Sequence, residues 1–276
     1  MMIENPNKNL AAKYDKLRQI LQPFQRVIVS YSGGVDSVFL LKVALDCLGP
    51  ENVLAYIGVS QSLARSEYDA ALQIASDLGA SLEIVHPREM SDPDYKANSA
   101  HRCFYCKTAL YSLLNDLARD RGFDAILAGT NLDDLGDFRP GLQAARDFHV
   151  LSPLQEAQLT KQDIRTLSKQ LNLPTWNKPA QPCLASRITY GLEVTPARLK
   201  QIEQGEAFLR SLGLTELRVR HHDHLVRIEV PPDKISLLLD DRQRTQIVDY
   251  FKELGFTYVS LDLEGFRSGS ANEALE

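Results

Sequence analysis

Four short apolar runs rich in β-branched residues alternate with helical stretches, and this alternation constrains the fold of the 276-residue chain more than any other feature. We expect strands over residues 26–32, 52–60, 81–86 and 124–130, with helices over 37–49, 64–79 and 108–122. Strands that are apolar almost throughout are typical of a parallel sheet covered on both faces. Because crossovers between parallel strands are right-handed, the pattern predicts a doubly wound α/β layer with ligands at the carboxyl ends of the strands.

The last third of the chain has a different pattern, which predicts a smaller α+β domain. Its expected order is helix 196–212, strands 216–222 and 225–230 joined by a hairpin turn, helix 232–254 and strand 258–264. The proline-rich segment before it has no clear period and is interpreted as a linker loop. We therefore expect an α/β domain over residues 1–175, a cysteine-bearing linker over 176–194 and a C-terminal domain over 195–276.

Composition and charge argue against several functional classes. With 44% hydrophobic and 24% charged residues the chain resembles an ordinary globular protein. Its 31 Lys and Arg against 36 Asp and Glu give a net charge of −5, which disfavours a general electrostatic grip on nucleic acid or acidic membranes. No apolar stretch has the length of a signal peptide or of a spanning helix, about 18 residues. We expect a cytoplasmic protein with neither a nucleic acid nor a membrane as partner.

The segment SYSGGVDS, residues 30–37, connects the first expected strand to the first helix. Gly33 and Gly34 let backbone N–H groups approach an anion, and the helix N-terminus adds its dipole. Asp36 would repel phosphate unless a divalent cation lies between them, so Asp36 is a candidate Mg²⁺ ligand. A glycine-rich turn with an Asp or Ser helix cap is the alternative.

This loop lacks the lysine of kinase-like phosphate loops and resembles the loop of the N-type ATP pyrophosphatases, the PP-loop superfamily. That resemblance implies cleavage of ATP between its α and β phosphates and adenylation of a substrate oxygen. The segment LAGTNLDD, residues 127–134, resembles the second nucleotide motif of that superfamily, with a plain strand-to-turn segment as the alternative. The candidate ATP-binding residues are Ser30, Ser32, Gly33, Gly34, Asp36, Ser37, Gly129 and Thr130.

Three of the four cysteines are candidates for chemistry, while Cys47 is interpreted as part of the core. Cys103 and Cys106 form a C-x-x-C before an expected helix, which fits half a zinc site, a redox pair or two ligands of an iron–sulfur cluster. Cys183 lies in an irregular loop, PCLASR. Three cysteines in this spacing can hold a [4Fe–4S] cluster with one iron open to an extra sulfide. Combined with an adenylating domain, they suggest sulfur transfer.

Five segments together resemble the LarE family over nearly the whole chain: SYSGGVDS, RCFYCK, GTNLDDLGDFRPGL, PCLASR and YVSLDLEGFRSGSANE. Members of this family are ATP-dependent enzymes that insert sulfur into the nickel-pincer nucleotide cofactor of lactate racemase. The resemblance implies adenylation of a carboxylate of pyridinium-3,5-biscarboxylic acid mononucleotide, and then replacement of oxygen by sulfur. It also implies a homo-oligomer, expected to be a hexamer, and a nickel-inserting enzyme downstream in the pathway.

The family offers two sulfur sources. In one branch the cysteine that matches Cys183 attacks the acyl adenylate and loses its own sulfur, leaving dehydroalanine. In the other branch three cysteines, matched by Cys103, Cys106 and Cys183, hold a [4Fe–4S] cluster whose extra sulfide is donated repeatedly. The three-cysteine match leads us to prefer the cluster.

Arginines are the natural partners of the phosphates on AMP and substrate. By the resemblance we assign Arg218, Arg220 and Arg267 to the substrate phosphate or the sulfur-transfer site, with exposed or ion-paired arginines as the alternative. Arg187 follows the cysteine loop, and Glu206 is either a site carboxylate or an ordinary helix-surface residue.

Two other functions remain open from the sequence. A PP-loop enzyme that thiolates tRNA would use the same loop, although the acidic net charge disfavours a long polyanion. A non-enzymatic nucleotide-binding module with zinc on the C-x-x-C would use the same two motifs.

Overall fold

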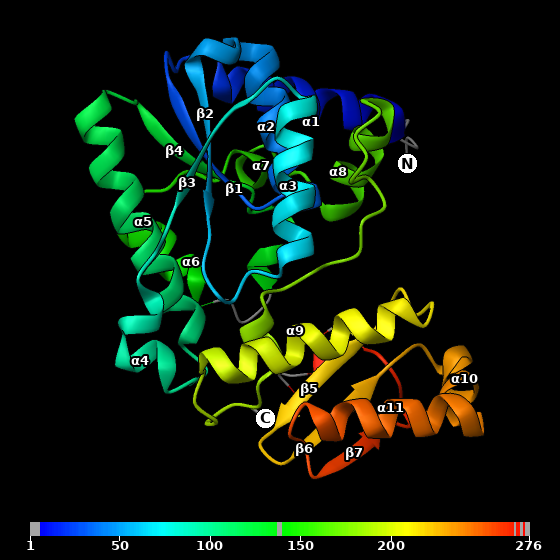
Figure 1. Ribbon diagram of the computed structural model, residues 1–276. Helices are drawn as coiled ribbons and strands as arrows, with labels where there is room; N and C mark the ends of the chain where they lie inside the picture. Colours follow the sequence, from blue (N-terminus) through cyan, green and yellow to red (C-terminus); the bar gives the residue numbers. More distant parts are fainter. Residues whose placement is uncertain (1–5, 137–139, 268, 271–272, 274–276) are drawn as a thin grey trace. The chain divides into compact units, whose positions relative to one another are not determined.

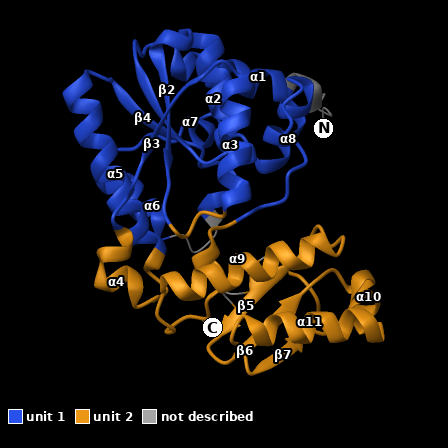
Figure 2. Cartoon of the chain, viewed as in Figure 1, with its two compact units in different colours: residues 1–60, 65–88, 103–181 blue, residues 61–64, 89–102, 182–276 orange. Residues whose placement is uncertain are grey.

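The computed structural model describes residues 6–136, 140–267, 269, 270 and 273 (Figure 1). Residues 137–139 of the segment GTNLDDLGDFRPGL and residues 268, 271 and 272 of the segment YVSLDLEGFRSGSANE lie outside the described part. The chain forms two compact units (Figure 2). Unit 1 contains residues 1–60, 65–88 and 103–181, and unit 2 contains residues 61–64, 89–102 and 182–276.

Unit 1 is built on a four-stranded parallel sheet, as predicted. The strands are β1 (Val27–Tyr31), β2 (Val53–Gly58), β3 (Ser81–Val85) and β4 (Ala125–Ala128), in the order β3-β2-β1-β4. The chain therefore leaves β1 for β2 on one side and later returns to place β4 on the other side. The carboxyl ends of β1 and β4 are neighbours, with Ser30 paired to Ala128, and this is the switch point where such sheets bind ligands.

Helices cover both faces of this sheet (Figure 1). The helices of unit 1 are α1 (Pro6–Leu21), α2 (Val35–Leu48), α3 (Arg65–Asp77), most of α5 (Arg102–Arg121), α6 (Gly141–Asp147), α7 (Pro153–Glu156) and α8 (Lys161–Gln170). On one face, Tyr111 and Leu114 of α5 pack with Ile28 and Ile126 of the sheet. On the other face, the Tyr31 hydroxyl donates to the Ala71 carbonyl of α3, and α2 packs between α1 and α8.

Unit 2 holds a three-stranded mixed sheet. Strands β5 (Arg218–His222) and β6 (Leu225–Glu229) form the predicted hairpin, and β7 (Tyr258–Leu261) pairs parallel to β6. Its helices are α4 (Pro93–Lys96), α9 (Pro196–Ser211), α10 (Ile235–Leu239) and α11 (Asp241–Glu253). Helix α9 approaches α11 closely at Gly205, where a Cβ would lie 2.6 Å from the Phe251 ring.

Two predicted elements were wrong in their extent. Helix α5 begins at Arg102, so the C-x-x-C lies inside its first turn and not before a helix starting at 108. No proline or glycine interrupts residues 102–121, which explains the longer helix. The helix expected over 232–254 breaks at Asp240, whose carboxylate accepts the N–H groups of Arg242 and Gln243 at 3.1 and 3.3 Å. An N-cap of this kind starts a new helix, α11.

Helices α1, α4, α6, α7 and α8 were not predicted. Two of them are very short, since α4 spans only Pro93–Lys96 and α7 only Pro153–Glu156. Among the helices of the described residues, none has the length and apolar character needed to cross a membrane.

The Asp240 cap gives a test of this architecture. Replacing Asp240 with Ala removes the acceptor of two helix N–H groups, so the free energy of unfolding should fall by about 1 kcal/mol. Asp241→Ala is the matched control because Asp241 is exposed and pairs with Arg244 in the same helix. Urea denaturation followed by circular dichroism measures both. Equal losses in the two variants would contradict the assigned cap.

Candidate active site

Serine hydroxyls shape the loop that follows β1. The Oγ of Ser37 accepts the Ser32 N–H at 3.2 Å, lies 3.1 Å from the Ser32 Oγ and donates to the Gly34 carbonyl at 3.2 Å. Gly34 is the N-cap residue of α2 and has no side chain with which to cap the helix. A helix N-terminus of this kind favours phosphate, because its N–H groups and its dipole point toward the anion.

Two glycines allow the close approaches that build this loop. Gly33 has a φ of +69°, and a Cβ there would lie 2.6 Å from the Cβ of Ala71 in α3. At the end of β4, a Cβ on Gly129 would lie 3.0 Å from the Ser37 nitrogen and 3.1 Å from the Asp36 carbonyl carbon. Because Gly129 has no side chain, the second nucleotide motif can pack directly against the start of α2.

The second motif is connected to the loop through Lys161. Asn131 accepts the Asp133 N–H, and Asp134 accepts the Asn131 N–H, both at 2.9 Å. The Asp133 carboxylate accepts the backbone N–H of Lys161 at 2.8 Å. The Lys161 Nζ then reaches the Asp36 carboxylate at 2.6 Å. Sequence reasoning missed Lys161 because it lies 125 residues from Asp36.

A second lysine from a distant segment also contacts the loop. The Nζ of Lys178 donates to the Gly33 carbonyl at 3.2 Å and pairs with Glu67 of α3 at 2.7 Å. The sequence shows that this loop has no lysine of its own. The structure shows that Lys161 and Lys178 supply the cationic groups instead.

No disulfide joins the four cysteines. Cys103 is exposed and Cys106 is half-buried, and they lie three residues apart in the first turn of α5, so they share a helix face. Cys183 is half-buried and precedes the short 3₁₀ helix Leu184–Arg187. Burial raises the pKa of the Cys47 thiol.

The three chemically interesting thiols are divided between the units. Cys103 and Cys106 belong to unit 1, and Cys183 belongs to unit 2. Across the described ranges, no three His, Cys, Asp or Glu side chains gather as a metal site. The iron–sulfur assignment therefore stays a prediction.

Within unit 2, a buried network holds the segment before the C-x-x-C to the segment after the loop cysteine. The buried Arg102 guanidinium donates to the Ala185 carbonyl at 3.0 Å and to the Asn98 side-chain carbonyl. The Asn98 amide in turn donates to the carbonyls of Thr189 and Leu192, both at 2.9 Å. These contacts connect residues directly adjacent to the two cysteine motifs.

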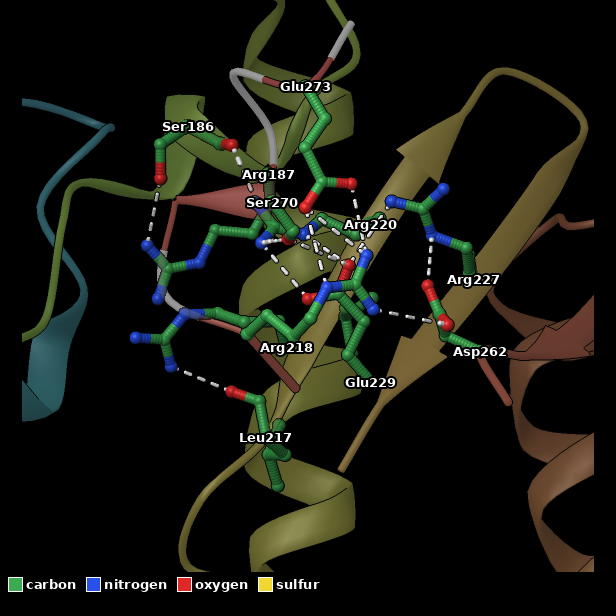
Figure 3. A network of polar contacts seen from close by, with 12 residues as sticks. Ser186, Arg187, Leu217, Arg218, Arg220, Arg227, Glu229, Asp262, Ser270 and Glu273 are labelled. Carbon is green, nitrogen blue, oxygen red and sulfur yellow. Dashed lines mark hydrogen bonds and ion pairs between the residues drawn. The ribbon is translucent and has the colours of Figure 1, made fainter. Parts of the chain in front are cut away.

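Glu229 gathers the arginines of the β5–β6 hairpin (Figure 3). The side chain of Glu229 is fully buried, and Arg220 donates to its two oxygens at 2.9 and 3.0 Å. Arg227 donates to the same carboxylate at 3.1 Å. Arg218 lies directly opposite Glu229 and two residues before Arg220, so the two arginines share a face of β5.

A second buried carboxylate, Glu206 of α9, organises the cysteine loop. It accepts Arg187 and Arg210, each at 2.9 Å. Arg187 also donates to the Cys183 carbonyl at 2.9 Å, so the pair fixes the loop beside the thiol. Burial acts to raise the pKa of Glu206, but Arg187 and Arg210 more than offset this and hold the pKa below its ordinary value. Glu206 is therefore not the surface residue considered as one alternative.

Arg218 is also buried. Its guanidinium lies 4.8 Å from the centre of the Phe266 ring and donates to the Leu217 carbonyl at 2.7 Å. Burial, followed by repulsion from Arg187, lowers the pKa of Arg218 to about 10. The side chain stays charged at neutral pH, and a nearby anion would be favoured there.

A cavity of about 290 Å³ lies within unit 2 on the arginine-bearing face. It is lined by Ser186, Arg187, Ile188, Thr189, Tyr190, Arg220, His222, Arg227, Asp262, Glu264, Arg267, Ser270 and Glu273. The Nη2 of Arg267 pairs with Glu264 at 2.9 Å and with Glu273 at 3.0 Å. Burial and then Arg227 lower the pKa of His222, which leaves this imidazole neutral.

The structure places the predicted residues in two groups. The ATP-binding candidates of unit 1, Ser30, Ser32, Gly33, Gly34, Asp36, Ser37, Gly129 and Thr130, lie at or beside the carboxyl ends of β1 and β4. The phosphate candidates of unit 2, Arg187, Arg218, Arg220 and Arg267, lie in or beside its cavity, with Glu206 behind Arg187. Their individual roles remain predictions. Residues that sequence reasoning missed are Arg102, Lys161, Lys178, Arg227 and Glu229.

A glycine loop at the switch point of a parallel sheet, with a carboxylate in the first helical turn, defines a PP-loop, ATP-using enzyme. The NAD synthase family profile matches residues 9–102. The chain is 43% identical to an uncharacterised protein of Synechocystis sp., over 96% of this chain and 99% of that protein. It is 35% identical to the tRNA-5-methyluridine(54) 2-sulfurtransferase of Pyrococcus horikoshii over only 44% of this chain and 39% of that enzyme.

The chain is also 41% identical to the pyridinium-3,5-bisthiocarboxylic acid mononucleotide synthase of Lactiplantibacillus plantarum, over 96% of both chains. The protein therefore belongs to the family of that synthase, the LarE family, and is an ATP-dependent sulfurtransferase. The predicted superfamily, fold and use of ATP are confirmed.

The close contact at Gly33 can be tested with two alanine variants. Gly33→Ala forces a methyl group against Ala71, so adenylate formation should slow about ten- to a hundredfold as the loop shifts. Gly79→Ala is the control, because Gly79 has a similar φ of +67° but nothing within 4 Å of an added Cβ. Pyrophosphate release measures the rate. Partial rescue of Gly33→Ala by Ala71→Gly is expected, and a Gly79→Ala variant that is equally slow would contradict the steric explanation.

Proposed function

We propose that this enzyme adenylates a carboxylate of pyridinium-3,5-biscarboxylic acid mononucleotide and then replaces oxygen by sulfur, giving a thiocarboxylate for the nickel-pincer cofactor of lactate racemase. Support comes from the 41% identical relative named for the bisthiocarboxylic product and from the ATP loop described above. A homo-oligomer, expected to be a hexamer, a cytoplasmic location and a downstream nickel-inserting enzyme belong to the same proposal.

The first step takes place at the loop after β1. A substrate carboxylate oxygen attacks the α-phosphorus of ATP, the bond to the oxygen bridging the α and β phosphates breaks, and pyrophosphate leaves. The N–H groups at the start of α2 bind phosphate oxygens as charge shifts onto the leaving group. Asp36 is the residue that would hold Mg²⁺, whose charge would neutralise the phosphates.

In the second step sulfur attacks the activated acyl carbon. The new C–S bond forms, the C–O bond to the phosphate breaks, and AMP leaves with one oxygen of the original carboxylate. A [4Fe–4S] cluster on Cys103, Cys106 and Cys183 would supply an extra sulfide on its open iron when bound. In support of this proposal, Cys103 and Cys106 share one helix face, Cys103 is exposed, and Cys106 and Cys183 are half-buried.

The observation that carries the cluster proposal is the Arg102 network. Its contacts to Asn98 and Ala185 fix residues next to both cysteine motifs within unit 2. A cluster needs its ligands held in register, whereas a sacrificed Cys183 would need no help from the C-x-x-C. In that alternative, Cys183 attacks the acyl carbon, and its Cβ–S bond then breaks with loss of the Cα proton, leaving dehydroalanine.

The cavity of unit 2 is the proposed site for the substrate phosphate. Arg220 and Arg227 are fixed by Glu229, so they can meet a ligand with little loss of side-chain entropy. Arg267 is held by surface carboxylates, which a phosphate could replace at this residue. A single nucleotide needs only a few such arginines, which agrees with the net charge of −5.

Turnover counting distinguishes the two sulfur sources. After anaerobic reconstitution with iron and sulfide, the cluster reaction should give more than one thiocarboxylate per chain, with Cys103→Ser losing this recycling. Cys47→Ser, which removes a thiol of α2 outside the proposed site, should retain it. A single turnover that leaves Cys183 lighter by the mass of H₂S, with Cys103→Ser unaffected, would instead establish sacrifice.

Neutralising each partner of the Arg267–Glu273 ion pair in turn tests the phosphate site. Arg267→Gln should weaken binding of the biscarboxylate mononucleotide about tenfold, because a charge-assisted hydrogen bond is lost. Glu273→Gln should strengthen it, since the competing carboxylate is removed. Isothermal titration calorimetry measures both, with Arg244→Gln on the surface of α11 as control. Changes of the same sign in the two variants would exclude this site.

A further inference from the structure

His222 lines the cavity of unit 2, and none of the steps proposed above involves it. It is the last residue of β5, is half-buried and lies on the same face of the strand as Arg220. Across the residues that the structure describes, no side chain or backbone group hydrogen-bonds to its imidazole. Both ring nitrogens are therefore open to a ligand in the cavity.

The two neighbouring histidines are placed differently. The Nε2 of His221 lies 3.0 Å from the Gln201 side-chain oxygen, and its Nδ1 accepts the N–H of Asp223 at 3.2 Å. The His221 ring also packs edge-on against Phe256, with their centres 4.9 Å apart. His224 is 78% exposed in the hairpin turn and pairs with Asp223. Neither imidazole belongs to the lining of the cavity as far as the structure describes it.

The arginine charges of the cavity are already balanced by carboxylates of unit 2. Each of the four lining arginines has an acidic partner: Arg187 pairs with Glu206, Arg220 with Glu229, Arg227 with Asp262 and Arg267 with Glu273. Glu264 adds a further negative charge beside Arg267. A phosphate dianion entering the cavity thus meets no unpaired arginine among the described lining residues. Its binding favours any group there that can gain positive charge.

His222 is the lining residue whose charge can change near neutral pH, because imidazole titrates between the carboxylates and the arginines. Burial, and then repulsion from Arg227 and Arg220, lower the pKa of His222, while Glu229 acts in the opposite direction. The other charged or titratable groups of the lining are Arg187 and Tyr190 on the loop and Asp262, Glu264, Arg267 and Glu273 after β7. A phosphate dianion beside the ring favours the imidazolium and so raises the pKa of His222.

We propose that His222 is a substrate-binding residue that takes up a proton as the substrate phosphate enters the cavity and then donates a charged hydrogen bond to it. The proton comes from the solvent and returns to it when the product leaves. By this means the enzyme distinguishes a mononucleotide from the riboside, which has no phosphate to favour the imidazolium. The inference rests on the proposed function, in which the cavity of unit 2 holds the substrate phosphate.

Isothermal titration calorimetry in buffers of different ionisation enthalpy counts the protons taken up on binding. With the whole protein and pyridinium-3,5-biscarboxylic acid mononucleotide at neutral pH, we expect an uptake of about one proton per bound ligand. His222→Gln should take up almost none. It should also bind about tenfold more weakly, because the charged hydrogen bond is lost.

The affinity should depend on pH with the sign of proton uptake. The pKa of His222 is higher in the complex than in the protein alone, so the imidazolium contribution is complete at low pH and is lost as the pH rises through the pKa of the complex. From about pH 6.5 to about pH 8.5 the affinity of the unchanged protein should fall about tenfold, while that of His222→Gln stays constant. The phosphate remains mainly a dianion over this range, since its second pKa is about 6.

His224→Gln is the matched control, because this exposed imidazole lies two residues away in the hairpin turn. It should take up the same number of protons as the unchanged protein. The riboside, titrated into the unchanged protein, makes the test independent of how well His222→Gln folds, and it should bind without proton uptake.

Three results would overturn the role of His222: no proton uptake by the unchanged protein, equal uptake by His222→Gln, or equal uptake with the riboside. A different failure would show that the cavity is not the substrate site. In that case the mononucleotide would not bind, or Arg267→Gln would bind it as tightly as the unchanged protein does. The proposed phosphate site would then be wrong, and the inference would fall with it.

Discussion

The close contact between the end of β4 and the start of α2 is the constraint on which the nucleotide site depends. Because Gly129 has no side chain, its backbone lies against Asp36 and Ser37. That contact joins two sequence motifs almost a hundred residues apart into one site at the sheet's switch point. It also determines where the Asp133 carboxylate accepts the N–H of Lys161, and therefore where the backbone of Lys161 lies at the start of α8. A larger residue at position 129 would push the second nucleotide motif away from the start of α2 and would displace the start of α8 as well.

Buried carboxylates play the corresponding part in unit 2. Glu229 and Glu206 each hold two arginines, and both are removed from water. Burying a charge is costly unless it is paired, so these acids and bases depend on one another. The consequence is a rigid set of guanidinium groups whose orientations are determined before any ligand binds. Removal of either acid would leave its arginines repelling one another.

Features set by residues that are close together in the sequence could be predicted. Contacts between residues that are far apart in the sequence could not. The strand, glycine loop and helix of SGGVDS, and the common face of Arg218 and Arg220, follow from local periodicity. The C-x-x-C and Cys183 were recognised from their local sequence, and the family resemblance supplied their expected roles. Nothing local shows that Lys161 meets Asp36, because any surface lysine at a helix start has the same pattern. The Asp240 helix break was missed because a single capping residue ends one helix and starts the next without a proline or glycine to mark the boundary.

The division of the chain between the units has a consequence for how this enzyme can be cut or shortened. Segments 61–64 and 89–102 belong to unit 2, although the chain on either side of them belongs to unit 1. The polypeptide thus passes from one unit to the other five times, after residues 60, 64, 88, 102 and 181. Cleavage at residue 181 would not release two complete modules, since Asn98 and Arg102 would stay with the first fragment while their partner carbonyls left with the second. A single cut in the polypeptide therefore cannot release either unit as a complete module.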